Sequence, residues 1–584
     1  KIGALLAPRA GARSAEGPGA TPWEMRVLVI GAGASGLVTA KTLRQRGHEV
    51  SIVEGGSRIG GTFENKSYKN ARMVSSKFLT CFSDFRRPDA ESHMLLADYV
   101  VYLEDYAAHF GLMDVIRFDT RIEKIKRVGE TGKYQVQVTP PDARHGHAEE
   151  WDAVAVCSGL HNVPSVPTFP GQGAFTGSMF HSAEYKDPAV FADKDILVVG
   201  SGETGFDVAY AAATNGARSV TLSTRHGFVS VPAMFSSALP PLDCIIMNWA
   251  THNWESNFAA RIGLHWWITT KFNRVGFWLM TGTTYGFNQW TGRRFNMTWD
   301  EGRKHIVNKS TKCMPLISRK LKMARPWWQR LPWWSMWDAP AVEAGKDVDV
   351  VEGPIVGMSD RTVTYETKKG KQDVKADIVV LATGYKQKFP FLFEDRPEDD
   401  PLPSEHFIIN PNEPNLAYIG FIRPNVGAIP PMAEMQAMWW CERLEGRLVA
   451  RSPDYYKLQG RRLDYGVDYG YYMFALAREI GAIPSLLYWL FRNPRIAITC
   501  GFGQAHMPIF RLQGPFRDPS AEETCARELL GPIMHRPFFM NAVLFVEGIV
   551  LGILNAATTA PGFALLSAAS AAALFRHQRR LSLQ

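Results

Sequence analysis

The chain has 584 residues, of which 46% are hydrophobic, and it carries a formal net charge of +8 at neutral pH. This length suits about two to three domains with a large core. The positive charge suits phosphate-bearing cofactors and anionic membrane surfaces. Because the sequence has no basic block and no base-stacking motif, nucleic acid is not expected as a partner.

The seven cysteines form no Cys-x-x-Cys pair and no metal-like spacing. No metal site is therefore predicted, and a reducing compartment is expected. The spacing also weighs against a pyridine-nucleotide disulfide reductase, because that class needs a closely spaced redox pair.

Residues 1–24 are rich in Ala, Gly, Pro and Arg and lack an apolar stretch long enough for a secretory signal. We expect a disordered or leader segment there, with Met25 as the natural start, and exclude it from the fold.

A glycine-rich turn follows the apolar run 27–30 and precedes a helical pattern. Glycines at such a turn allow a tight bend and a close approach of the backbone to a pyrophosphate, which the helix N-terminus holds. The cofactor-binding residues predicted in this turn are Gly31, Gly33, Ala34, Ser35 and Gly36.

The next strand, 49–53, ends at Glu54, about twenty residues past the turn. A carboxylate there accepts hydrogen bonds from a ribose hydroxyl and repels a 2′-phosphate, so the site is predicted to bind FAD and not NADP. The backbone is expected to pass close to the same cofactor at Gly61, Thr62 and Phe63. The alternative is an ordinary tight turn without a ligand.

The first part of this FAD-binding domain is predicted over 25–165. Its βαβ opening is followed by an expected helix over 97–110 and by expected strands over 134–138 and 153–157.

A second turn of the same kind follows the apolar run 196–199. The strand that follows this turn, 219–224, ends at Arg225 and not at an acidic residue. A guanidinium there can pair with a 2′-phosphate, which favours NADPH over NADH. A surface arginine at a strand end is the alternative. The other residues predicted to bind this cofactor are Gly200, Gly202, Glu203, Thr204 and Gly205.

The NADPH-binding domain is predicted over 166–345, with a tryptophan-rich insertion over 232–340. This insertion reads either as a packed helical segment or as a membrane-interface belt. The chain is then expected to return to the FAD-binding domain over 346–445 and to continue as a helical region over 446–536.

The C-terminal segment, 537–584, is predicted to anchor the protein in a membrane. An apolar run over 538–557 meets the spanning length, with Glu547 as its only charge. Positive residues flank the tail on both sides, so a re-entrant hairpin that turns at Pro561 is preferred over a single span. A buried helical hairpin in a soluble protein is the alternative.

Further motifs connect the two turns and follow them along the chain. Phe175, Gly177, His181, Tyr185 and Lys186 form a stretch just before the second turn. The remaining motifs are 382–385 (Ala-Thr-Gly-Tyr), 420–436, which includes Gln436, and 508–515.

With these motifs the chain resembles the flavin-containing monooxygenase family, which is a class B flavoprotein monooxygenase family with dimethylaniline monooxygenase-like activity. The resemblance implies an α/β fold with two Rossmann-like dinucleotide-binding domains. It also implies an NADPH-dependent FAD enzyme that uses O2 to oxygenate nitrogen or sulfur of a lipophilic small molecule through a flavin C4a-hydroperoxide. In this reading Gln436 belongs to the segment that closes the flavin site, and the protein is membrane-associated, at the endoplasmic reticulum facing the cytosol.

One position departs from the family pattern. Aligned on its Asn-Ser-Ser-Lys-like stretch, the chain has Val74 where the family has an asparagine against the flavin edge. Ser75 or a backbone amide then replaces the missing hydrogen bond, or the enzyme releases hydrogen peroxide. His181 is a further catalytic candidate, although packing between the linker and the nicotinamide domain explains it better than proton transfer.

Three alternatives to nitrogen or sulfur oxygenation stay open. They are ketone insertion of the Baeyer-Villiger type, an NADPH oxidase that makes hydrogen peroxide, and a non-catalytic sensor that retains the fold. The sequence does not identify the substrate, and a homo-oligomer is left open.

Overall fold

The computed structural model describes residues 24–225, 347–393 and 403–538 apart from short gaps, with short stretches between 233 and 317 and between 541 and 546. Most of the insertion 232–340 and residues 1–23 lie outside the described residues. The choice between a packed helical insertion and a membrane-interface belt therefore falls outside them as well.

The first Rossmann-like unit is built on a mostly parallel six-stranded sheet in the order β18-β19-β7-β1-β2-β3. Strand β1 lies near its middle and pairs in parallel with β2 and β7, and its apolar residues are buried. The strands are β1 (Arg26–Ile30), β2 (Glu49–Val53), β3 (Ile116–Arg117), β7 (Ala153–Val156), β18 (Ile409–Asn410) and β19 (Glu413–Tyr418).

The second Rossmann-like unit is built on a five-stranded parallel sheet in the order β12-β11-β10-β16-β9. Its strands are β9 (Ser178–His181), β10 (Asp195–Val199), β11 (Ser219–Thr224), β12 (Val348–Glu352) and β16 (Ile378–Leu381). In each unit a helix follows the nucleotide-binding turn: α1 (Ala34–Gln45) after β1 and α5 (Glu203–Thr214) after β10. The predicted pair of Rossmann-like folds is confirmed.

The predicted return to the FAD-binding domain at 346 is wrong. Strands β12 and β16 pair with β11 and β10, so the second unit extends to about residue 384. The apolar pattern of these strands marks them as buried strands but does not say which sheet receives them, because partner choice is non-local.

Two linkers cross between the units and pair with each other. β8 (Val163–Pro164) and β17 (Tyr385–Lys386) run antiparallel, and Ser165 N–H donates to Gly384 O at 2.9 Å. Thr383 Oγ1 donates to Ser165 O, and Asn162 Nδ2 donates to Lys388 O at 2.8 Å. The units are thus joined by a short two-stranded ribbon.

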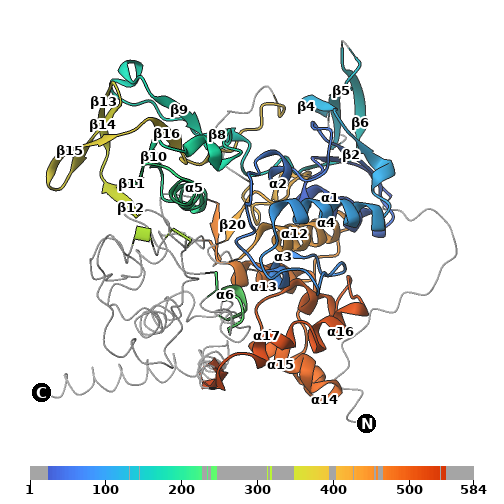
Figure 1. Cartoon of the computed structure of the whole chain (residues 1–584). Coiled ribbons are helices and arrows are strands. Elements are labelled where there is room, and N and C mark those ends of the chain that lie inside the picture. The colour runs from blue at the N-terminus through green and yellow to red at the C-terminus, as the bar shows by residue number, and fades with distance from the viewer. Residues whose placement is uncertain are drawn as a thin grey trace, which may run out of the picture.

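An antiparallel sheet flanks each unit (Figure 1). The sheet of the first unit packs Ile125, Tyr134 and Val136 onto its core, and the sheet of the second packs Val363 and Tyr365 onto its core. Their strands are β4 (Arg121–Val128), β5 (Lys133–Thr139) and β6 (His147–Trp151), and β13 (Ile355–Ser359), β14 (Thr362–Thr367) and β15 (Gly370–Lys375).

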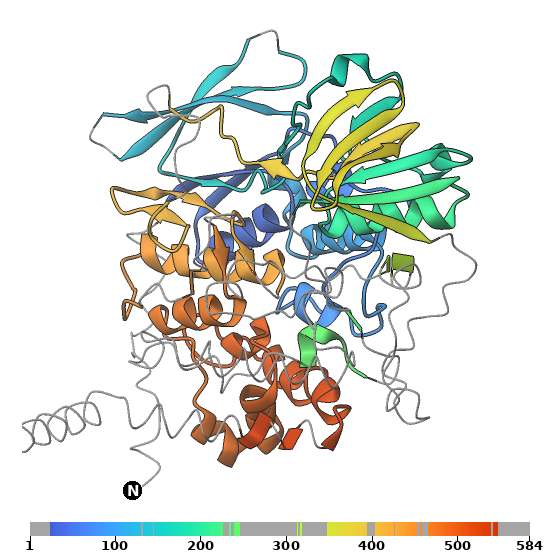
Figure 2. The same ribbon diagram turned by 90° about the vertical axis from the view of Figure 1, so that its left-hand side faces the viewer.

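Helices complete the core around the first unit. α12 packs along α1, and the predicted helix over 97–110 is found as α4. Figures 1 and 2 show α14–α17 at the end of the molecule opposite to β13–β15. The helices are α4 (Leu96–His109), α12 (Ile429–Leu444), α13 (Tyr469–Glu479), α14 (Leu486–Arg492), α15 (Pro494–Phe502), α16 (Ser520–Ala526) and α17 (Leu530–Met534).

The predicted localisation at the endoplasmic reticulum membrane is corrected by the structure. Among the residues that the structure describes, none belongs to a helix both long and apolar enough to cross a bilayer. Most of the predicted anchor, 537–584, including its turn at Pro561, lies outside the described residues.

The turn between α1 and β2 is fastened to the end of α12 through Glu445, which is almost fully buried. Arg46 Nε donates to Glu445 Oε1 at 3.3 Å, and Arg447 Nη1 lies 2.8 Å from Oε2. His48 Nε2 faces the same carboxylate at 3.7 Å. Burial opposes the negative charge, but hydrogen bonds from His48 and Arg46 outweigh it and lower the pKa of Glu445 to about 2.

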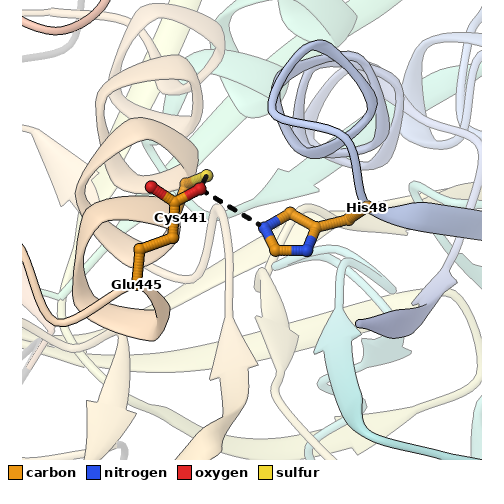
Figure 3. A group of neighbouring side chains, drawn as sticks. All are labelled: His48, Cys441 and Glu445. Carbon is orange, nitrogen blue, oxygen red and sulfur yellow. Dashed lines mark hydrogen bonds and ion pairs between the residues drawn. The ribbon is translucent and has the colours of Figure 1, made fainter. Parts of the chain in front are cut away.

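His48, Cys441 and Glu445 also gather their ligand-type atoms within 4.8 Å of one another (Figure 3). The N–H of Met25 donates to His48 Nδ1 at 3.3 Å, so Nε2 carries the ring hydrogen and points at the carboxylate. A protonated nitrogen cannot bind a metal ion. We therefore interpret the cluster as an ion-pair network between α1 and α12.

The Glu445→Gln substitution should lower the free energy of unfolding by about 2–3 kcal/mol at about pH 7. A carboxyl group with a depressed pKa stabilises the fold above its unfolded pKa, and this stability is lost as the pH falls toward the folded pKa. The difference between the urea-unfolding midpoints of wild type and variant should therefore shrink on going from about pH 5 to about pH 2. A gap that stays constant with pH would contradict this account.

Candidate active site

A cavity of about 1410 Å³ is lined by both glycine-rich turns and therefore by both Rossmann-like units. Among the predicted site residues, Gly36, His181 and Gln436 do not line it. Those that do are Gly31, Gly33, Ala34, Ser35, Glu54, Gly61, Thr62, Phe63, Val74, Ser75, Gly200, Gly202, Glu203, Thr204, Gly205 and Arg225.

Some glycines of the turns are required by the fold itself. Gly31 has a φ of +107°, and a Cβ added at Gly36 would lie 1.8 Å from the Gly31 carbonyl oxygen. A Cβ added at Gly205 would likewise lie 2.0 Å from the Gly200 carbonyl oxygen. The helix in each unit thus starts so close to its strand that no side chain fits between them.

Gly33 and Gly202 are different, because the protein leaves room for a side chain at both. Among the residues that the structure describes, a Cβ at Gly33 would come no nearer than 3.6 Å to its closest neighbour, Gly61 Cα, and one at Gly202 would meet nothing within 4 Å. Both residues are N-caps without a side-chain cap and line the cavity. This open space at two helix N-termini fits the pyrophosphate of a dinucleotide.

Glu54 holds the first turn in shape. Its Oε2 accepts a hydrogen bond from Ala32 N–H at 2.7 Å, and its Oε1 accepts one from Gly56 N–H at 2.8 Å. A carboxylate oxygen accepts more than one hydrogen bond, so the side chain remains able to bind a ribose hydroxyl. The predicted FAD-binding role thus fits its geometry.

Arg225 is exposed at the end of β11 and lines the part of the cavity formed by the second unit. Beside it, the hydroxyl groups of Ser201 and Thr224 are hydrogen-bonded at 3.1 Å, which ties the second turn to the strand end. The guanidinium is therefore presented where a dinucleotide on α5 would carry its 2′-phosphate.

The segment that carries Val74 and Ser75 faces the same cavity from the first unit. Ser75 is buried, and its hydroxyl is hydrogen-bonded to that of Thr80 at 2.7 Å. Val74 offers only an apolar surface. This part of the wall therefore presents an apolar side chain next to a serine whose hydroxyl is already hydrogen-bonded.

His181 lies at the end of β9 with both ring nitrogens bound to backbone. Ala183 N–H donates to Nδ1 at 3.1 Å, so Nε2 carries the hydrogen and donates to Gly384 O at 3.0 Å. Burial lowers the pKa of His181. The ring of Tyr385 packs edge-on against the imidazole of His181, with the two ring centroids 5.1 Å apart. This arrangement favours the packing role over proton transfer.

Gln436 is fully buried in α12 behind the cavity. Its Oε1 accepts from Gly420 N–H at 2.8 Å, and its Nε2 donates to Tyr472 Oη at 2.8 Å. Tyr472 in turn donates to His406 O at 2.7 Å. Gln436 thus positions the cavity-lining backbone at Gly420 and does not reach the cavity itself.

A further polar contact at the cavity, between Tyr68 and Asp207, is not predictable from the sequence. Tyr68 and Asp207 both line it, and Tyr68 Oη donates to Asp207 Oδ2 at 2.8 Å. Tyr68 follows the short helix α2 (Thr62–Asn65) and Asp207 lies on α5, so this bond joins the two units across the site. No local motif connects residues 139 positions apart, so only the fold could show the pair.

Known flavin monooxygenases are similar in sequence to this chain over most of its length. The sequence matches the family described as "Flavin-binding monooxygenase-like" over residues 24–296 and 346–528. It is 36% identical to "Monooxygenase ptmN" of Penicillium ochrochloron over 577 residues, which cover 91% of this chain and 93% of that protein. It is 29% identical to "Flavin-containing monooxygenase 2" of Homo sapiens over 523 residues, which cover 84% of this chain and 89% of the human protein.

Solved structures agree in fold. An S-allyl-L-cysteine S-oxygenase from Allium sativum has a TM-score of 0.52 at 19% identity, with 86% of this chain and 99% of that chain covered. A steroid monooxygenase bound to NADP has a TM-score of 0.51 at 17% identity, with coverages of 77% and 96%. The resemblance found in the sequence motifs is confirmed: the chain belongs to the flavin-binding monooxygenase-like family and is a flavoprotein monooxygenase.

Proposed function

We propose that the protein is an NADPH-dependent FAD monooxygenase that oxygenates nitrogen or sulfur of a lipophilic small molecule with O2. The observation that carries this proposal is the single cavity lined by two dinucleotide turns of different character. An acid follows the first turn and an arginine follows the second, which suits FAD at the first and NADPH at the second.

The residues of the chain divide the binding work between the two cofactors. The N-termini of α1 and α5 hold the two pyrophosphates, and Gly33 and Gly202 give the backbone access to them. Glu54 accepts from a ribose hydroxyl, and Arg225 pairs with a 2′-phosphate. The flavin, when bound, accepts a hydride and activates oxygen, while Val74 and Ser75 exclude water from the cavity wall.

The function is tested by giving the purified holoprotein NADPH, isotopically labelled O2 and one substrate at a time. The substrates are a tertiary amine such as N,N-dimethylaniline, an aryl methyl sulfide and a cyclic ketone. We expect a labelled N-oxide or sulfoxide by mass spectrometry. A labelled lactone as the main product would establish Baeyer-Villiger chemistry instead.

A second candidate function, an NADPH oxidase, is favoured by the apolar side chain of Val74 at the cavity wall. If the missing donor causes loss of peroxide, Val74→Asn should lower the ratio of hydrogen peroxide released to NADPH consumed. The matched control is Val74→Ala, which changes the size of the side chain without adding a donor and should not lower this ratio. Peroxide release that stays low in the wild type would leave the oxidase reading without support.

The Gly202→Ala substitution should raise the Kd for NADP⁺ by at least about tenfold while the flavin content stays at the wild-type level. The added methyl group meets no atom of the described residues within 4 Å, so we expect it to obstruct a ligand and not the fold. Isothermal titration would measure the Kd and absorbance the flavin. Gly173→Ala, which is equally open but lies away from the cavity, serves as the control. Unchanged NADP⁺ binding in Gly202→Ala would refute the placement of the cofactor.

The Arg225→Ala substitution should raise the KM for NADPH about 10- to 100-fold more than the KM for NADH, because a charge-assisted contact to the 2′-phosphate is lost. Steady-state NADPH and NADH oxidation would measure both constants. The control is Arg218→Ala. Arg218 directly precedes β11 and is ion-paired to Asp195, so its loss should change the KM for NADPH and the KM for NADH equally. Equal effects in Arg225→Ala would show that this arginine does not read the phosphate.

A further inference from the structure

A buried carboxylate lies directly behind the cavity wall formed by Val74 and Ser75. Asp243 belongs to the short helix α6 (Leu242–Ile245) and is 3% exposed. Its Oδ2 accepts a hydrogen bond from the backbone N–H of Ser76 at 2.7 Å. Cys244 Sγ lies 3.7 Å from its Oδ1 and 3.9 Å from Ser76 Oγ. The donor, Ser76 N–H, is thus one residue past the serine that lines the cavity.

This placement is energetically unusual. A carboxylate removed from water costs several kcal/mol unless its oxygens are hydrogen-bonded. Within the described part of the chain, no lysine or arginine forms an ion pair with Asp243. Among the described residues, the bond to Ser76 N–H is the shortest polar contact of this carboxylate, at 2.7 Å.

Helix α6 is itself held in place from the C-terminal side. Arg536 is buried, and its Nε donates to Cys244 O at 3.1 Å, a contact that Nη2 repeats. Its Nη1 donates to Phe502 O at 2.7 Å, at the end of α15. Figure 1 shows α6 beside α17 and α3 (Lys77–Thr80), in agreement with the contacts between these elements. Asp243 is thus also anchored by contacts outside the segment that it binds.

The other end of the same segment is held in the same way. Glu434 of α12 accepts a hydrogen bond from Ser83 N–H at its Oε2, at 3.0 Å, and a second from the Ser83 hydroxyl at Oε1. Arg511 and Asp84 complete a buried cluster there with Lys41, whose Nζ lies 2.5 Å from Asp84 Oδ2. Two buried carboxylates from distant parts of the chain therefore hold 76–83 at both ends.

We infer that Asp243 is a positioning residue of this monooxygenase: by binding Ser76 N–H it fixes the backbone of 74–76, and with it the apolar wall that faces the flavin. The inference rests on the proposed function for its consequence in turnover. The effect of Asp243 on the backbone at Ser76 does not depend on the proposed function.

The test compares Asp243→Ala with Asp243→Asn. Amide hydrogen exchange in the peptide that contains Ser76 should be about five- to thirtyfold faster in Asp243→Ala, because one buried hydrogen bond is lost. Asp243→Asn keeps an accepting oxygen and should restore slow exchange. During NADPH oxidation, Asp243→Ala should release a larger fraction of hydrogen peroxide with an unchanged KM for NADPH, and Asp243→Asn should reverse this increase.

A matched control separates positioning from general loosening. Thr499 is fully buried and donates from Oγ1 to Cys525 O at 2.8 Å, away from the cavity, so Thr499→Val removes a buried hydrogen bond elsewhere. If Thr499→Val speeds exchange at Ser76 as much as Asp243→Ala does, or if exchange in Asp243→Ala is unchanged, the inference is overturned. If Asp243→Ala does not fold, Asp243→Ser, whose shorter side chain cannot reach Ser76 N–H, takes its place. Failure of the wild type to oxygenate any substrate would instead count against the proposed function and leave the exchange result interpretable.

Discussion

The close approach of each nucleotide-binding helix to the strand before it is the constraint on which the rest of the site depends. At Gly36 and Gly205 a Cβ atom would lie only 1.8 and 2.0 Å from a carbonyl oxygen, far inside van der Waals contact. The helix can start there only without a side chain, and its first N–H groups then point into the cavity. Both glycine-rich turns, Glu54 and Arg225 line the cavity together with these two starting points.

The same constraint explains why the two nucleotide-binding turns can be predicted from the sequence. A strand, a glycine turn and a helix are contiguous, so their residues stand in a fixed local order that predicts a local structure. Glu54 and Arg225 each follow the next strand along the chain, so the same local order predicts them. The roles of Gln436 and His181 are harder to predict from the sequence, because both side chains bind backbone groups of distant segments, at Gly420 and Gly384.

The parts that sequence reasoning missed are non-local. The pairing of β12 and β16 with the second sheet depends on which strand edge is free, and the apolar pattern of a strand does not carry that information. The carboxylates of Asp243 and Glu434 read as ordinary acids in the sequence, although the fold buries both against backbone N–H groups. The motif at 508–515 was recognised only by resemblance, and the structure gives its physical basis, because Arg511 neutralises the buried cluster around Glu434.

The paired linkers determine how the second unit can move. A two-stranded antiparallel ribbon, such as β8 with β17, resists stretching and sliding because either motion breaks its cross-strand hydrogen bonds. Twisting and bending leave those bonds largely intact, since ribbons of two strands tolerate a wide range of twist. The ribbon itself therefore resists separation and sideways sliding of the second unit, whereas rotation of that unit is opposed by contacts outside the ribbon, such as the hydrogen bond between Tyr68 and Asp207.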